Sequence, residues 1–198
     1  MRTIEKTVFT FDELTDTAKE KARDWYRRGA LDYDWWDGIL EDFVHICSLL
    51  GIETHTPDIF FSGFYSQGYG ASFRGNYTYK KGCVNALTDY APDDKELRRV
   101  AEELASVQRK NFYQLRASIG KQSSRYTHEM TMFVDVERDD DKEPTADAQD
   151  CLEECMRELA RWLYRTLEAE YEYLRSNEPV DEALLANAYE FDEEGGRV

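Results

Sequence analysis

The spacing of apolar residues changes along this chain, and that change most limits what the chain can fold into. Residues 14–29, 34–50, 93–107 and 145–175 carry apolar side chains at helical spacing. Between the last two of these segments, residues 113–119 and 126–136 alternate apolar with polar side chains, which is typical of antiparallel strands with one buried face. Because strands and helices do not alternate regularly, the pattern predicts an α+β fold and not a parallel sheet.

Shorter segments complete this prediction. Residues 57–80 indicate a strand, a glycine-containing loop and a returning strand over 72–79, and residues 82–90 indicate a short helix. A short edge strand is expected over 4–9, a hairpin turn near 120–124, a last helix from about Pro179, and a frayed tail after Phe191. Thr15 is expected to cap the first helix, and Gly51 to end the second.

Together these segments predict an antiparallel sheet of about four strands packed against several helices, with a long C-terminal helix. We expect an α+β core over residues 1–143 and an acidic helical segment over 144–198 packed on the same domain.

The net charge of −16 is unevenly distributed. Residues 138–198 hold 19 Asp and Glu against 7 Lys and Arg, a net of −12, whereas residues 1–137 hold 22 acids against 18 bases, a net of −4. Such a surface repels DNA and RNA and attracts basic proteins, including those that hold nucleic acid. The alternative is that the charge only keeps the protein soluble.

Cysteine usage and hydropathy predict a cytosolic protein. The four cysteines form no Cys-x-x-Cys pair, residues 1–10 contain no apolar leader, and no apolar run approaches the roughly 20 residues that span a bilayer. Free, mostly buried thiols are therefore expected, and no membrane attachment.

No motif in the sequence predicts catalysis, a cofactor or a metal. Gly68-Tyr69-Gly70 lacks the further glycines and the Lys-Ser/Thr of a phosphate loop, so a hairpin loop is the simpler interpretation. The acidic run Asp139 to Glu143 lacks the spacing of a calcium loop. The three histidines, His45, His55 and His128, stand apart in sequence, and His128 falls on the apolar face of its predicted strand.

Two sets of residues are candidate partner contacts. Phe64, Tyr65 and Tyr69 form either an exposed aromatic contact patch or part of the core. The acidic candidates are Asp139, Asp140, Asp141, Glu153, Glu154 and Glu158. On the long helix, interleaved arginines at i+3 and i+4 spacing are expected to neutralise part of this charge.

Several segments carry a resemblance to a known group of proteins. They are Phe11-Asp12-Glu13-Leu14, Ala22-Arg23-Asp24-Trp25-Tyr26, Trp35-Trp36, Leu50-Gly51-Ile52 and Phe61 to Gly68. Together they resemble a family of uncharacterised phage and prophage proteins, often labelled automatically as an antitoxin of a toxin–antitoxin stability system. The resemblance covers about residues 10–137, and Ser62 to Gly68 is its most specific part. Tyr69 stands where many relatives have an acidic residue, and no active site is carried over.

The resemblance implies a phage origin and a place in the host bacterial cytoplasm. Together with the acidity, it leads to the hypothesis of a phage-encoded inhibitor of a bacterial defence system, similar to anti-CRISPR proteins. Such an inhibitor would bind a basic, nucleic-acid-binding surface of a host complex. The alternatives are an antitoxin-like protein that neutralises a partner toxin, and an enzyme acting on a small molecule through distant residues.

Overall fold

The computed structural model describes residues 6–122 and 126–198, and it confirms the α+β class. These residues form two compact units. One, here called the sheet unit, comprises residues 36–168. The other, the terminal unit, comprises residues 1–35 and 169–198. The division differs from the expected boundary at 143/144, because the first and last helices of the chain pack on each other.

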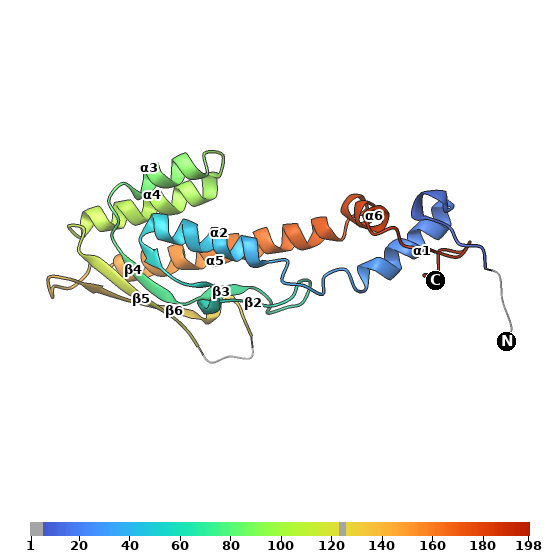
Figure 1. The fold of residues 1–198 in the computed structure, drawn as a ribbon. Coiled ribbons are helices and arrows are strands. Elements are labelled where there is room, and N and C mark those ends of the chain that lie inside the picture. Colours follow the sequence, from blue (N-terminus) through green and yellow to red (C-terminus); the bar gives the residue numbers. More distant parts are fainter. Residues whose placement is uncertain (1–5, 123–125) are drawn as a thin grey trace. The chain divides into compact units, whose positions relative to one another are not determined.

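The sheet unit contains the predicted antiparallel sheet of four strands. Its order is β1 (Ile52–Glu53), β4 (Gly75–Thr78), β5 (Leu115–Lys121) and β6 (Met132–Arg138) (Figure 1). In the centre of the sheet, Ala117 lies opposite Tyr77 on one side and Val136 on the other. A separate two-stranded sheet pairs β2 (Ile59–Phe61) with β3 (Ala71–Phe73), and η2 (Thr56–Asp58) precedes it. The antiparallel pairing of β5 with β6 confirms the predicted hairpin.

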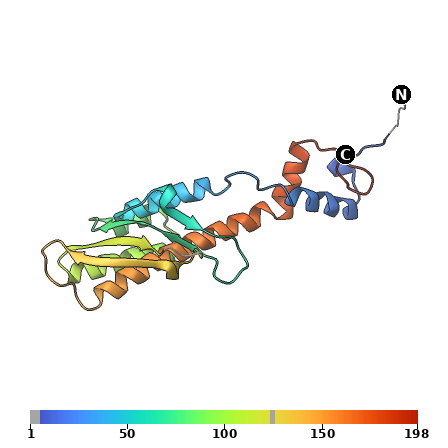
Figure 2. The same ribbon diagram turned by 90° about the horizontal axis from the view of Figure 1, so that it is seen from below.

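Helices cover one face of the four-stranded sheet and leave the other open to solvent (Figures 1 and 2). Leu115 and Ile119 of β5 are buried, whereas Arg116 and Ser118 between them are exposed. The covering helices are α2 (Asp37–Leu50), α3 (Cys83–Tyr90), α4 (Lys95–Lys110) and most of α5 (Ala148–Leu174). The core therefore lies between this helical layer and the apolar face of the sheet.

Local signals in the sequence set the helix ends. The Thr15 hydroxyl accepts a hydrogen bond from the Ala18 amide and starts α1 (Asp16–Arg27), as predicted. Gly51 ends α2 with a φ of 87°, a left-handed conformation that favours glycine. On α5, the predicted stripe is buried at Leu152, Cys155, Met156, Leu159, Leu163 and Leu167.

The structure corrects the predicted strands at three places. The returning strand expected over 72–79 is two strands in different sheets, and a Cβ at Gly75 would lie 2.4 Å from the Glu53 carbonyl oxygen. The strand expected from Tyr126 begins only at Met132, because η3 (Glu129–Thr131) precedes it. Tyr113 has a φ of 62° and lies outside β5. β5 continues to Lys121, and the rest of the expected turn falls largely on 123–125, outside the described residues.

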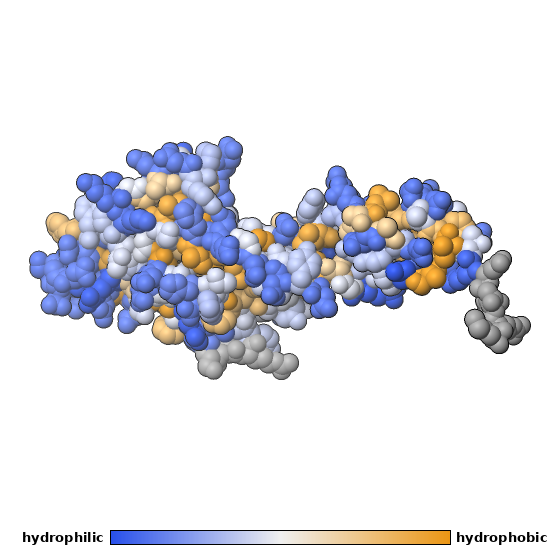
Figure 3. Space-filling model, viewed as in Figure 1, coloured by the Kyte–Doolittle hydropathy of each residue, from blue (hydrophilic) through white to orange (hydrophobic). Residues whose placement is uncertain are grey.

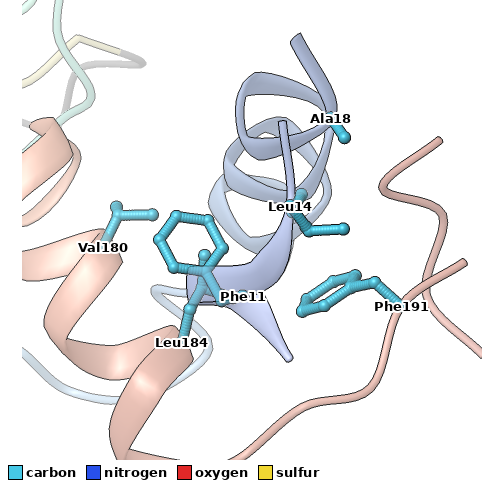
Figure 4. Close-up of a cluster of buried hydrophobic side chains, with 7 residues drawn as sticks. Phe11, Leu14, Ala18, Val180, Leu184 and Phe191 are labelled. Atoms are coloured by element: carbon cyan, nitrogen blue, oxygen red, sulfur yellow. The ribbon is translucent and has the colours of Figure 1, made fainter. Parts of the chain in front are cut away.

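The terminal unit has a small core of its own. It is formed by η1 (Phe11–Glu13), α1, α6 (Asn177–Ala186) and the tail (Figure 4). Its buried residues are Phe11, Leu14, Ala18, Ala22, Val180, Leu184 and Phe191.

The expectation of a frayed tail after Phe191 is wrong, because the Asp192 amide bonds to the Gly196 carbonyl at 2.9 Å and the Val198 amide bonds to the Glu190 carbonyl at 3.1 Å. Phe191 is fully buried, and its backbone pairs with Phe9 through N···O distances of 2.8 and 2.9 Å. Phe191 also bridges to Arg197. Of the expected first strand, residues 6–9 are described and contribute the bridge at Phe9, whereas residues 4 and 5 lie outside the described residues.

Most of the surface seen in Figure 3 is hydrophilic, in keeping with a chain of which 33% is charged. No helix within the described ranges has the length and apolar character needed to cross a bilayer.

Candidate protein-binding surface

The loop between β2 and β3 presents aromatic side chains on a closed backbone. The Ser62 amide donates to the Gly70 carbonyl at 3.0 Å, and the Tyr69 amide donates to the Ser66 carbonyl at 3.2 Å. The Ser62 hydroxyl adds a bond to the Thr127 carbonyl at 3.2 Å. These bonds tie both ends of the loop together and fix them to the segment before η3.

The structure brings the three predicted aromatic residues together on this loop. Tyr65 is 72% exposed and has a φ of 71°, which is unusual for a side chain of its size. Tyr69 is 39% exposed, and Phe64 is half-buried against Tyr164 of α5 at a ring distance of 5.4 Å. The interpretation as a contact patch therefore fits Tyr65 and Tyr69, whereas Phe64 serves partly as their support.

Two further tyrosines extend the patch. The Tyr164 hydroxyl donates to the Gly63 carbonyl at 2.9 Å, and burial raises the pKa of Tyr164 above its usual range. Tyr126 is 55% exposed and lies directly against the loop, since a Cβ at Gly68 would be 3.2 Å from its ring. The term aromatic surface is used below for these five residues: Phe64, Tyr65, Tyr69, Tyr126 and Tyr164.

An apolar groove of about 590 Å³ lies on β2, the strand that leads into this loop. Trp36 and Phe61 meet edge to face in its wall, with ring centroids 5.5 Å apart. Phe60 also lines it, and Arg74 lies over the Phe60 ring at 5.1 Å. Thr127 lines the groove and accepts the loop's Ser62 bond, so the groove and the aromatic surface share this neighbour.

Asp139, Asp140 and Asp141 follow the end of β6. Asp139 lies 3.5 Å from Arg116, and Asp140 accepts two hydrogen bonds from Arg138, at 2.8 and 2.7 Å. The bonds from Arg138 lower the pKa of Asp140 below its usual range. Two of the three carboxylates are therefore engaged by arginines of the same chain.

The three glutamates on α5 are also paired within the chain. Glu153 pairs with Arg157, Glu154 pairs with Arg161, and Glu158 accepts from Arg99 of α4 at 2.7 Å. Glu158 is only 12% exposed in its side chain.

The six acidic candidates thus do not form one patch. Glu154 shares Arg161 with Glu129 of η3, which lies 3.7 Å from that arginine, whereas Glu158 pairs with an arginine of α4.

The structure also places His128 and the four cysteines. His128 is not on a strand face as expected, because its Nδ1 accepts a hydrogen bond from the Met130 amide and caps η3. Within the described residues, no three His, Cys, Asp or Glu side chains are grouped so that they could hold a metal ion. The thiols of Cys47, Cys83 and Cys155 are free and buried, and Cys151 is free and partly exposed.

Sequence reasoning missed Tyr126 and Tyr164 as surface residues. Tyr126 was expected on the apolar side of a strand, but η3 removes it from that strand. Tyr164 carried a usable signal, since it lies off the buried stripe of α5 one position after Leu163.

Comparison with known proteins identifies the family. The profile of a family described as a domain of unknown function, DUF8835, matches residues 35–177. The chain belongs to this family. No curated protein matches the chain, and no solved structure matches it either. The matched region contains the whole aromatic surface and the groove beside it.

Proposed function

We propose that this chain is a binding protein that inhibits a bacterial defence complex, with the aromatic surface as its main contact and a basic, nucleic-acid-binding surface as its target. The observation that carries the proposal is the exposure of Tyr65 and Tyr69 on a fixed loop, together with Tyr126, which lies against that loop. The phage origin implied by the sequence resemblance and the net charge of −16 supply the choice of partner.

Exposed tyrosines on an ordered backbone are well suited to contact a partner protein. Tyrosine is enriched at interface hot spots because its ring provides a large contact area and its hydroxyl a hydrogen bond. The loop bonds of Ser62 and Tyr164 hold the backbone in place before a partner arrives, which reduces the entropy lost on binding. The adjacent groove extends this contact with an apolar wall from Trp36 to Phe61.

The charge supports a basic partner at longer range. The sheet unit holds 24 Asp and Glu against 16 Lys and Arg, a net of −8, and the terminal unit holds 17 against 9, also −8. Both units are thus acidic even after every arginine is counted. A field of this sign raises the rate at which basic proteins meet the chain and disfavours nucleic acid as a direct ligand.

The test begins with identification of the partner. The tagged full chain is used to capture proteins from nuclease-treated lysates of bacteria that carry defence systems, at low and at raised salt. We expect to recover a nucleic-acid-binding effector whose capture weakens as salt rises. The purified effector should then lose nucleic-acid binding when the chain is added.

Variants of the aromatic surface decide whether it is the contact. Tyr65→Ala is expected to weaken effector binding by about 2 kcal/mol or more, the loss typical of a hot-spot tyrosine. Tyr173→Ala is the matched control, because Tyr173 is 52% exposed on α5 in the terminal unit. Equal affinity of the Tyr65 variant and wild type would contradict the proposed contact. Recovery of a small toxin in place of an effector would support the antitoxin alternative.

A further inference from the structure

Two pockets meet at the C-terminal end of α1 in the terminal unit. The first, of about 550 Å³, is walled by the rings of Trp25, Tyr26 and Tyr189. The second, of about 430 Å³, is lined by Arg27, Arg28 and Arg175 together with Tyr171 and one carboxylate, that of Asp32. Arg28 and Gly29 line both pockets, so the two are adjacent at these residues. We propose that they form one site for a mononucleotide, with the base in the aromatic pocket and the phosphate in the arginine pocket.

The aromatic pocket has rings held at fixed angles. Trp25 and Tyr189 meet edge to face with centroids 5.2 Å apart, and Tyr26 lies 6.4 Å from Tyr189. The Arg197 guanidinium lies over the rings of Tyr189 and Trp25 at 5.0 and 5.8 Å. Aromatic rings that are fixed in this way can stack on the flat face of any of the nucleobases. The volume falls within the range of pockets that hold small ligands.

The arginine pocket has three guanidinium groups that are oriented by backbone carbonyls. Arg27 Nε donates to the Arg175 carbonyl at 3.0 Å, and Arg175 donates back to the Arg27 carbonyl at 3.5 Å. Arg28 Nε donates to the Asp24 carbonyl at 3.1 Å. Carbonyl acceptors carry no formal charge, so these bonds position Arg28 and Arg175 without neutralising them. Arg27 is partly neutralised by the Asp24 and Glu20 carboxylates, at 3.0 and 3.8 Å, and also donates to the Asn177 side chain.

Phosphate is the group that this arrangement fits best. A guanidinium offers parallel N–H donors that match two phosphate oxygens, and each arginine here spends only part of its five donors on the backbone. Gly29 adds room at the junction, because a Cβ there would meet no described atom within 4 Å. The pocket thus combines stacking surfaces and phosphate donors around one open junction.

Arginines also occur at helix C-termini simply because they bond to the last carbonyls, and that role explains the bonds of Arg27 and Arg28 by themselves. It does not explain why an aromatic pocket also lies against Arg28 and Gly29. The net charge of −16 disfavours a long nucleic acid, whose phosphates would extend over acidic surface. A single nucleotide meets only the nearby charges, three arginines against Asp32 and the Asp24 that pairs with Arg27, because charges beyond roughly 8 Å are screened at physiological salt.

The experiment is isothermal titration calorimetry of the full chain with AMP, GMP, CMP and UMP, and with adenosine and inorganic phosphate as half-ligands. We expect at least one mononucleotide to bind more tightly than either half-ligand. Arg28→Glu should weaken that binding about 10- to 100-fold, because it removes a charge-assisted contact and adds repulsion. Arg109→Glu is the matched control, since Arg109 is an exposed arginine of α4 in the sheet unit and its reversal changes the net charge equally.

Tyr189→Leu separates the two pockets, because it removes one stacking ring and leaves the arginines in place. This variant should bind the nucleotide at least about tenfold more weakly and bind phosphate as wild type does. Circular dichroism spectra must match wild type for each variant. Absence of binding by all four nucleotides at millimolar concentration would overturn the proposal. So would phosphate binding as tight as nucleotide binding, or equal affinities of the Arg28 and Arg109 variants.

Discussion

Replacement of Phe191 by alanine tests whether the tail belongs to the core of the terminal unit. The ring is fully buried among Phe11, Leu14 and the apolar face of α6, and it meets Trp25 edge to face at 6.0 Å (Figure 4). Truncation of a buried phenylalanine costs about 3–5 kcal/mol through lost burial and the cavity that remains. The Trp25 contact adds to the burial term, so we expect a value in the upper half of that range.

Urea unfolding followed by tryptophan fluorescence measures this cost. Trp25 and Trp35 report on the terminal unit, while Trp36 and Trp162 report on the sheet unit. The loss should appear in the Trp25 signal, which is isolated by Trp→Phe replacement of the other three.

Leu185→Ala is the control for the Phe191 variant. Leu185 is 52% exposed on α6, so its truncation should cost less than about 0.5 kcal/mol. A Phe191→Ala variant within 1 kcal/mol of wild type would refute the claim that the tail is part of the core.

Three other measurements follow from local structure. Gly51→Ala should destabilise the sheet unit by more than about 1 kcal/mol in urea unfolding, because its φ of 87° is strained for alanine and the new Cβ would lie 2.2 Å from a carbonyl oxygen of β4. Ellman's reagent should modify Cys151 before the other thiols, because the hydrogen bond with Cys155 lowers the pKa of the Cys151 thiol. The same bond and burial raise the pKa of Cys155. A Cys151→Ser variant that still shows a fast phase of thiol modification would contradict this prediction. Asp140→Asn should lower the melting temperature at pH 7. Because the bonds from Arg138 lower the pKa of Asp140, their contribution is present above the ordinary aspartate pKa of about 3.9 and is lost as pH falls through the lower folded value, so the difference from wild type should close in strong acid.

Apolar periodicity was sufficient to predict the helices and strands that depend only on the burial of one face. The stripe of α5 and the alternation of Leu115, Ala117 and Ile119 were predicted because each buries one continuous face. The same pattern failed at residues 126–131. There the side chain of His128 accepts the Met130 amide and the Thr131 amide bonds to the His128 carbonyl, and these local bonds replace the ladder of a strand.

Long-range pairing accounts for the other failures. The tail after Phe191 was expected to fray because it is acidic and rich in glycine, and nothing local shows that Phe191 pairs with Phe9, 182 positions earlier, or that it bridges to Arg197. Likewise the sequence shows Glu158 as an acid on a helix, but not that Arg99, 59 positions away, will bind it. The loop that carries the aromatic candidates was predicted, since the neighbouring glycines already indicated it.

Charge and contact therefore have separate roles in the proposed binding. Five of the six predicted acidic contacts already pair with the chain's own arginines, or in one case an arginine and a lysine, so a partner would have to displace those pairs before it could use them. Reversal of Glu158 would place a positive charge against Arg99 and would disturb the packing of α5 on α4, so lost binding in that variant would not identify a contact. Tyr65 is 72% exposed, so its truncation removes little buried surface, and lost binding in that variant is easier to assign to a contact. Since the net charge acts over the whole surface and the tyrosine acts at one point, the Tyr65 variant is the one that separates a docking site from a merely acidic protein.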